Sequence, residues 1–338
     1  MNNRDFRIDF MRVFACIMVL FCHAPQPYIN QPGQFMMGIN NYFGMAWGPI
    51  LFFAISGACI LDKEHEAIPF LKKRFARILI PTIVWSVIYI FTEAFWWHTS
   101  STGGVFTKLP MILLTPQYGL MWFMYALIAI YLVAPIISRW INVCSQKEIL
   151  LYLGLWSITL LFPYIELFGI DCSNIQSKTG MLYYMSGFLW YAVAGYYCKK
   201  YININKISLK YVIIGFLILI SPLYVFIIKQ YSNCSVGTSS CLFPMFTTMM
   251  AFIVIMNIKY PHWLIEGFWH KAVELLSRLS FGIYLVHMLI MYPFRIWIAQ
   301  YNINYIIQIP VTVVFVGICS VILSWLLSKL SFGKYLIG

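Results

Sequence analysis

The first apolar stretch of the chain, RIDFMRVFACIMVLFCH at residues 7–23, contains three side chains that could do chemistry. Arg12 and His23 are separated by close to three whole α-helical turns, so on a helix they would share one stripe, roughly 16–17 Å apart along the axis. Asp9 precedes Arg12 by one turn and can pair with it. Neutral imidazole titrates near working pH, so His23 could serve as a general base or, alternatively, as a nucleophile.

Charged side chains of this kind are unusual inside a membrane span. Each can cost about 2.5–3.5 kcal/mol even on the gentler insertion scale, so they should face a bundle interior or a watery cavity. Arg12 could instead extend to the inner headgroups with Asp9 as its partner, and a histidine near the outer interface could be satisfied by ordinary contacts. The combination at whole-turn spacing favours a catalytic site made of Asp9, Arg12 and His23.

A second basic cluster, FLKKRFARILIP at residues 70–81, precedes the third apolar segment. Arg74 and Arg77 are one turn apart if this segment is helical, so they would share a face and form a fork for phosphate groups. The planar donors of arginine suit phosphate because they bind it bidentately. The usual excess of basic residues in cytoplasmic loops explains the cluster equally well.

These residues belong to a chain with the composition of a membrane protein. Of its 338 residues, 61% are hydrophobic and 10% are charged, and the mean hydropathy is +0.78. Soluble domains average about 45–50% apolar and 25% charged residues, so a soluble protein is excluded. The first apolar run lacks a small-residue cleavage site, which predicts a retained span rather than a signal peptide. Residues 1–338 are therefore expected to form one integral-membrane domain without an appended soluble domain.

Apolar runs long enough to span a bilayer predict an all-α, polytopic helix bundle. About ten are expected, at residues 8–28, 43–62, 78–97, 118–141, 149–168, 181–198, 210–228, 241–258, 276–298 and 306–328. With the N-terminus inside, all but four of the 23 lysines and arginines are cytoplasmic, so both termini should be cytoplasmic. The four outer ones are Lys108, Lys178, Lys229 and Arg295. The net charge of +12 is therefore a topology signal of a multi-pass plasma-membrane protein, not a nucleic-acid-binding patch.

The nine cysteines show no CxxC spacing, and no metal site is expected. Cys234 and Cys241 flank a short polar segment, NCSVGTSSC, in a predicted outer loop. They could form a disulfide if the outside is oxidising, or remain free thiols.

Several motifs occur together in one order along the chain. They are the arginine and histidine of the first apolar run, GPILFFAISG at 48–57, the Arg74–Arg77 pair, YGLMWFMYALIAIYLVAPII at 118–137 and LSFGIYLVHM at 279–288. This ordered set resembles the acyltransferase-3 family of integral-membrane acyltransferases over nearly the whole chain. One departure is Ala58, because the tripeptide that is commonly Ser-Gly-Phe in the family ends in alanine here.

The resemblance implies an O-acetyltransferase that moves acetyl from cytoplasmic acetyl-CoA to a hydroxyl of an exported or lipid-linked cell-envelope polysaccharide. The family's arginine–histidine motif maps onto Arg12 and His23, and its RxxR motif onto Arg74 and Arg77, which would hold the donor phosphates. The thioester would then reach His23 from the inner face. The expected partners are acetyl-CoA, the glycan or lipid-linked glycan acceptor, and membrane lipid.

Six further residues are candidates for substrate binding, each with a simpler structural explanation: Trp122, Tyr125, Glu93, Glu166, Tyr284 and His287. The last two match an SxGIYLxH pattern of the family, although a packed interhelical hydrogen bond explains them at least as well. The first two could form a sugar-stacking platform or an interfacial aromatic belt. The two carboxylates could accept hydrogen bonds from sugar hydroxyls or simply reach water.

A secondary transporter or flippase for a lipid-linked sugar is the alternative function, since ten spans with few buried charges suit it too. Transporters of that kind often show internal repeats and broken helices near the bilayer midplane. No repeat is found in this sequence, and its polar residues gather in one helix and one inner loop, which favours the acyltransferase.

Overall fold

The computed structural model describes residues 4–25, 44–166, 170, 172, 179–203, 242–301 and 303–337. Within these residues the regular elements are all helices and no β-strand occurs, which confirms the predicted all-α class. The elements are α1 (Phe6–His23), η2 (Ala46–Ile50), α3 (Leu51–Ile60), α4 (Ala67–Phe91), η3 (Thr92–Trp96), α5 (Gly104–Lys108), η4 (Leu109–Leu113), η5 (Gly119–Met121), α6 (Trp122–Val143), α7 (Gln146–Thr159), α8 (Phe162–Glu166), η6 (Tyr183–Met185), α9 (Leu189–Tyr201), α11 (Leu242–Asn257), α12 (His262–Ile265), α13 (Gly267–Ala299), α14 (Tyr305–Lys329) and α15 (Gly333–Ile337).

Five helical stretches of the described chain are long and apolar enough to cross a membrane: Ala67–Trp96, Gly119–Val143, Gln146–Glu166, Gly267–Ala299 and Tyr305–Lys329. They coincide with five of the ten predicted spans. The predicted span at 8–28 corresponds to α1, which carries three charged side chains within its 18 residues. Those at 43–62, 181–198 and 241–258 correspond to shorter helices, and the span at 210–228 lies outside the described residues.

Helices α1 and α13 pack side by side and run in the same direction. Near the start of α1, Asp9 accepts a hydrogen bond from Ser277 of α13 at 2.6 Å. Farther along, the Cys16 thiol lies 3.8 Å from a backbone carbonyl of α13. At the end of α1, Arg295 donates to the backbone oxygen of His23 at 2.6 Å. Residue numbers therefore rise together along both helices, and segments from opposite ends of the sequence form one side of the core.

Helices α3 and α9 approach each other through glycines. A Cβ atom added to Gly57 would lie 1.9 Å from the backbone oxygen of Ala192, and one added to Gly195 would lie 2.1 Å from that of Ala54. Small residues at such crossings allow close van der Waals packing, which drives association where lipid removes the hydrophobic gain. The apolar composition of these helices is thus matched by a packing surface that only glycine fits.

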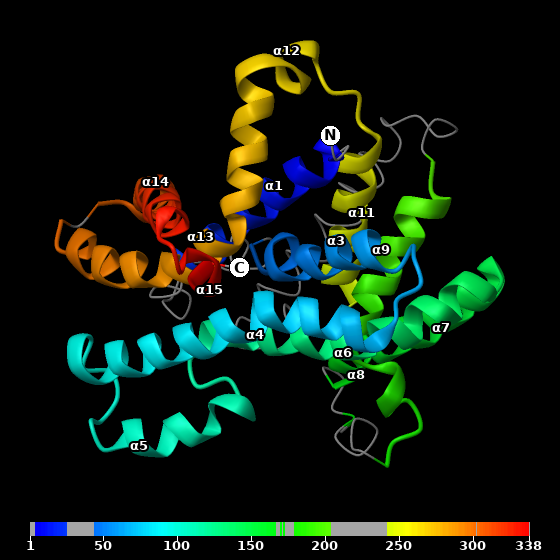
Figure 1. The fold of residues 1–338 in the computed structure, drawn as a ribbon, viewed down its shortest axis with the longest axis horizontal. Coiled ribbons are helices and arrows are strands. Elements are labelled where there is room, and N and C mark those ends of the chain that lie inside the picture. Colours follow the sequence, from blue (N-terminus) through cyan, green and yellow to red (C-terminus); the bar gives the residue numbers. More distant parts are fainter. Residues whose placement is uncertain are drawn as a thin grey trace.

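Helices α4 and α6 lie side by side along one side of the bundle (Figure 1). They are antiparallel, since Phe70 at the start of α4 meets Tyr131 of α6, whereas Tyr89 near its end stacks on Tyr118, just before η5. The C-terminal α15 closes against α4, where the indole of Trp85 donates to a backbone carbonyl of α15 at 2.7 Å. This arrangement brings the basic start of α4 and the aromatic end of α4 to opposite ends of the molecule.

The crossing of α3 and α9 generates a stability prediction. Gly195→Ala should destabilise the protein by at least about 1–3 kcal/mol, because the new methyl group meets backbone that cannot rotate away. The measurement is the thermal unfolding temperature of purified protein in detergent. Gly154→Ala on α7 is the matched control, since its Cβ would meet nothing within 4 Å, and its unfolding temperature should stay the same or rise. Equal unfolding temperatures for the Gly195→Ala variant and the wild type would contradict the close approach.

Candidate active site

The carboxylate of Asp9 is the centre of a charged cluster at the start of α1. Asp9 is only 4% exposed, and Arg4 donates to it twice, from Nε at 2.9 Å and from Nη2 at 2.6 Å. Ser277 supplies a third hydrogen bond at 2.6 Å. The predicted ion pair with Arg12 is present but longer, at 3.5 Å. Arg4 is therefore the main partner of Asp9, and helical spacing could not have indicated it because Arg4 lies before the helix begins.

Arg12 keeps donors available because Asp9 is engaged mainly by other groups. Its side chain is 32% exposed, and Nη2 points at the sulfur of Cys59 at the end of α3, at 3.7 Å. A thiol is a weak acceptor, so it compensates little of the guanidinium charge. Arg12 is placed to attract an anion at this end of the bundle.

The other end of α1 brings two imidazoles together. His23 is the last residue of the helix, and its ring centroid lies 5.3 Å from that of His287 on α13. Nδ1 of His287 lies 2.6 Å from the backbone oxygen of Tyr284. A carbonyl oxygen can only accept, so Nδ1 carries the proton and Nε2 presents a lone pair. The ring of His287 is fully buried, and its Nε2 has no hydrogen-bond partner among the described residues.

Arg295 fixes the end of α1 from the neighbouring helix. Its Nη1 donates to the backbone oxygen of His23 at 2.6 Å. The last carbonyls of a helix lack partners within it and carry partial negative charge, so a cation here stabilises the end of the helix that carries His23. From the sequence Arg295 is predicted only as an outer-side charge, and no spacing signal connects it with a residue so far away in the chain.

Two predicted substrate-binding tyrosines have structural hydrogen bonds instead of open hydroxyls. Tyr284 donates to the backbone oxygen of Leu120, and Tyr125 donates to that of Ile112. The Tyr284 bond joins α13 to η5, whereas the Tyr125 bond joins segments only 13 residues apart.

The other predicted substrate-binding residues lie apart from the two histidines. Trp122 packs against Phe188, with ring centroids 5.2 Å apart. Glu93 forms an ion pair with Lys108 at 2.7 Å. Glu166 is exposed at the end of α8. Of the six candidates, therefore, His287 alone is in ring contact with His23.

The predicted basic cluster is helical and forms the start of α4. The guanidinium carbon of Arg74 lies 5.4 Å from the ring centroid of Phe70 and 5.5 Å from that of Tyr131, which are cation–π distances. Arg77 is exposed one turn later. Neither arginine forms an ion pair with any residue in the described part of the chain. Their planar donors are therefore available to an external anion.

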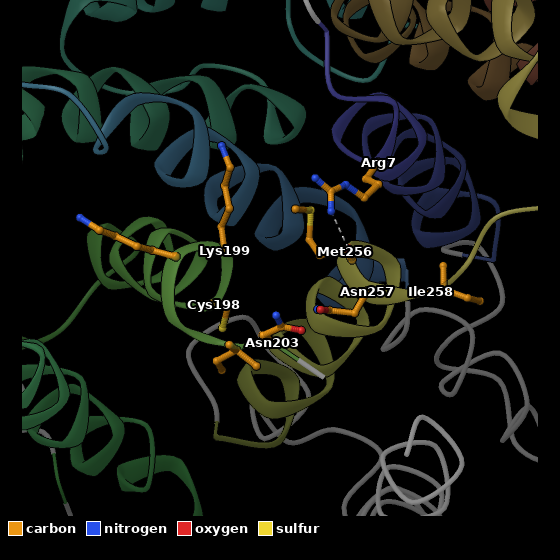
Figure 2. A pocket seen from close by; sticks show the side chains of 9 residues that line it. Arg7, Cys198, Lys199, Asn203, Met256, Asn257 and Ile258 are labelled. Atoms are coloured by element: carbon orange, nitrogen blue, oxygen red, sulfur yellow. Dashed lines mark hydrogen bonds between the residues drawn. The ribbon is translucent and has the colours of Figure 1, made fainter. Parts of the chain in front are cut away.

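A cavity of about 380 Å³ opens between α1, α9 and α11 (Figure 2). Three cations line it, Arg7, Lys199 and Lys200, and no carboxylate is found among the lining residues in the described part of the chain. Arg7 Nη1 donates to the backbone oxygen of Met256 at 3.3 Å, and Lys199 donates to that of Ala58 at 2.9 Å. Arg7 lies on α1 and the two lysines lie near the end of α9, so only the fold brings the arginine to the lysines.

Asp5, the N-cap of α1, shares the charge of Arg7. Its carboxylate accepts from the backbone nitrogen of Arg7 at 3.0 Å and from Nε and Nη2 at 2.9 Å. Partial burial acts to raise the pKa of Asp5, but the hydrogen bonds and charge of Arg7, with a smaller effect of Lys199, outweigh it and hold that pKa below its usual value. Asp5 is therefore ionised at neutral pH and orients the Arg7 side chain.

The side chains at both ends of α1 are of the types that acid–base and group-transfer chemistry uses. Within the described residues, no three histidines, cysteines or carboxylates gather as they would to hold a metal ion. The site thus consists of a histidine pair at one end of the α1–α13 pair and of cations at the other end.

A bundle of apolar helices with such a site defines a membrane protein with candidate catalytic groups. Comparison with protein families matches the chain to the acyltransferase domain of the acyltransferase-3 family over residues 5–329. The chain therefore belongs to this family and is a membrane acyltransferase. Neither the curated proteins nor the solved structures give a match.

The Asp9 cluster generates a prediction about stability. Asp9→Ala should destabilise the protein by roughly 1.5–3 kcal/mol, because it removes the charged acceptor of the Arg4 and Ser277 hydrogen bonds. Glu274→Ala is the matched control: it removes the ion pair with Arg278, in which the Arg278 side chain is 59% exposed, so the cost should be at most about 1 kcal/mol. Thermal unfolding of both variants in detergent measures the difference. If the two substitutions lower the stability against unfolding equally, Asp9 does not organise this cluster.

Proposed function

We propose that this chain is an O-acetyltransferase of the plasma membrane that moves acetyl from cytoplasmic acetyl-CoA to a hydroxyl of an exported or lipid-linked cell-envelope polysaccharide. The observation that carries the proposal is the contact between His23 and the buried His287 at the end of α1. A histidine pair in an apolar bundle supplies the acid–base group that acyl transfer needs. Membership of the acyltransferase-3 family supports the reaction class.

The donor would be held by the cations at the start of α1 and α4. Coenzyme A is a polyanion with a long, flexible arm that ends in the thioester. Arg74 and Arg77 offer bidentate donors to its phosphates, and Arg12 adds positive charge near the start of α1, where its Nη2 points at Cys59 of α3. Arg12 and His23 are separated by roughly 16–17 Å along α1, so the arm would extend along this helix to bring its thioester to the imidazole.

In one route, His23 acts as a general base. The unprotonated nitrogen of its imidazole takes the proton of the acceptor hydroxyl while the hydroxyl oxygen attacks the thioester carbonyl. The tetrahedral intermediate then collapses, the carbon–sulfur bond breaks, and the imidazolium returns the proton to the leaving thiolate of CoA. The products are the acetyl ester and free CoA.

In the other route, His23 acts as a nucleophile. Its nitrogen attacks the thioester carbonyl, the carbon–sulfur bond breaks, and the N–H proton of the acetylimidazolium passes to the CoA thiolate, which leaves as the thiol. The acceptor hydroxyl then attacks the acetyl carbonyl, the carbon–nitrogen bond breaks, and the hydroxyl proton passes to the imidazole. Both routes require one unprotonated nitrogen on His23. The lone pair on Nε2 of His287 supports this requirement, because it can accept the N–H of His23 and so select the tautomer whose other nitrogen faces the substrate.

The role of His23 generates a prediction about activity. His23→Ala should lower the rate of acetyl transfer at least about 100-fold, because a positioned acid–base group contributes that much or more. The assay measures free CoA released from acetyl-CoA by purified protein in liposomes when an envelope glycan is present. His262→Ala is the matched control, since the side chain of His262 is 82% exposed, and it should retain full activity.

Two outcomes of that assay would overturn the proposal. Full activity in a properly inserted His23→Ala variant would remove His23 from the chemistry. Wild-type protein that releases no CoA but moves a lipid-linked sugar across the bilayer would be a transporter or flippase.

The basic start of α4 generates a prediction about donor binding. Arg74→Ala and Arg77→Ala should each raise the KM for acetyl-CoA roughly tenfold or more, which corresponds to the loss of one hydrogen bond to a charged group. Lysine at either position should restore binding poorly, because it lacks the bidentate fork. Lys73→Ala removes an exposed cation from the same helix and serves as the control. If the lysine variants bind the donor normally, the pair is only a topology signal.

A further inference from the structure

A second cavity, of about 240 Å³, lies where the end of α4 meets the end of α13. Its lining is mainly aromatic and includes Trp96, Trp97, Tyr292, Trp297 and Gln300. It lies at the same end of α13 as Arg295 and His287, so it adjoins the end of the bundle that carries the histidine pair. None of these five residues was selected from the sequence.

A continuous row of stacked rings connects this cavity with the turn of α13 that carries His287. Trp97 stacks on Tyr292 with centroids 4.4 Å apart and lies 5.9 Å from Tyr118. Tyr118 in turn stacks on Tyr89 at 4.3 Å and 11°. The hydroxyl of Tyr89 donates to the backbone oxygen of a residue two positions before His287, at 2.6 Å. The row therefore forms one wall from the cavity toward the histidines.

The indole of Trp97 carries a donor that this packing leaves unused. Its Nε1 is buried and has no hydrogen-bond partner within the described chain. A buried N–H without a partner is unfavourable, so a ligand acceptor that reached it after a small shift of the lining side chains would be stabilised. A ligand that has a hydrogen-bond acceptor on one edge and an apolar face would match both this N–H and the aromatic wall.

The backbone beside Trp97 is strained. His98 has φ of 54°, in the left-handed region that non-glycine residues rarely adopt. The strained turn is held by a hydrogen bond from the backbone nitrogen of Thr99 to the oxygen of Glu93 at 2.9 Å, and by the ion pair of Glu93 with Lys108 at 2.7 Å. Strain of this kind persists where the surrounding structure enforces it, often at ligand sites. Here the bend directly follows Trp97, which lines the cavity.

We propose that this cavity is the subsite that binds one sugar ring of the acceptor. A pyranose has an apolar C–H face that can lie on Tyr292 or Trp297, and hydroxyl oxygens that can accept from the amide of Gln300 and, once the lining side chains shift, from Trp97 Nε1. The cavity has the volume of about eight water molecules in the liquid, which is the scale of a single sugar ring. The identity of the occupant rests on the proposed function, in which the acceptor is a glycan.

An interfacial aromatic belt is the competing explanation for these rings. Belt residues lie in the headgroup region with their polar atoms in water, and the exposure of Trp96 and Trp297, 62% and 51%, fits a belt as well as a subsite. Trp97 differs because its N–H is buried and its ring is stacked on another helix. A belt predicts that all exposed tryptophans behave alike, whereas a subsite predicts that those of the cavity behave differently.

The test measures sugar binding in the absence of any acyl donor. Purified protein in nanodiscs is titrated with a panel of methyl pyranosides, and saturation-transfer NMR on the sugar-ring protons gives the dissociation constants. Trp97→Phe keeps the ring but removes the N–H, and should weaken binding about tenfold or less, as for one neutral hydrogen bond. Trp297→Ala should weaken binding by a similar factor. The matched controls, Trp263→Phe and Trp269→Ala, alter tryptophans that are 62% and 53% exposed outside the cavity, and should bind as the wild type does.

Two results would overturn the subsite. One is the absence of saturable binding of any glycoside to wild-type protein. The other is an equal effect of the cavity variants and the controls, which is the result expected of a belt. The two proposals fail separately: protein that binds glycosides but releases no CoA keeps the subsite and loses the acetyltransferase, whereas protein that releases CoA but binds no glycoside loses only the subsite.

Discussion

Compensation of the charges on α1 is the constraint on which the rest of this bundle depends. A carboxylate that is 4% exposed in an apolar setting requires partners, and Asp9 finds them in Arg4 before the helix and in Ser277 on α13. The second partner fixes the register of α13 against α1. With the register fixed at one end, the parallel packing brings His287 and Arg295 to His23 at the other end.

Much of the fold follows from periodicity and hydropathy, which depend on nearest neighbours along the chain. These signals predict the helical class, the five long apolar helices and the one-turn pairing of Asp9 with Arg12. The resemblance to a family adds His287 as a candidate, and the structure places it beside His23. Local signals do not reveal that Arg4 binds Asp9 more closely, because Arg4 reaches back from outside the helix.

The remaining differences arise from contacts between distant segments. The sugar-stacking interpretation assigned to Trp122 depends on an open ring face, yet that ring packs against Phe188 from another helix. An aromatic residue near the end of a span has the same local sequence whether its ring is covered or open. Trp97 illustrates the converse, because its sequence context is unremarkable and its buried, unused N–H is evident only once α13 packs beside it.

The contacts of Arg295 and Lys108 also affect how membrane orientation is inferred from charge. Both belong to the small set of basic residues that the proposed topology places on the outer side. Arg295 is bound to the carbonyl end of α1, and Lys108 is neutralised by Glu93. In the folded bundle each of these two cations has a partner for its charge, so its place on the outer side costs the finished structure little. A count of lysines and arginines scores both against the proposed orientation, whereas their contacts give each of them a structural reason to lie there.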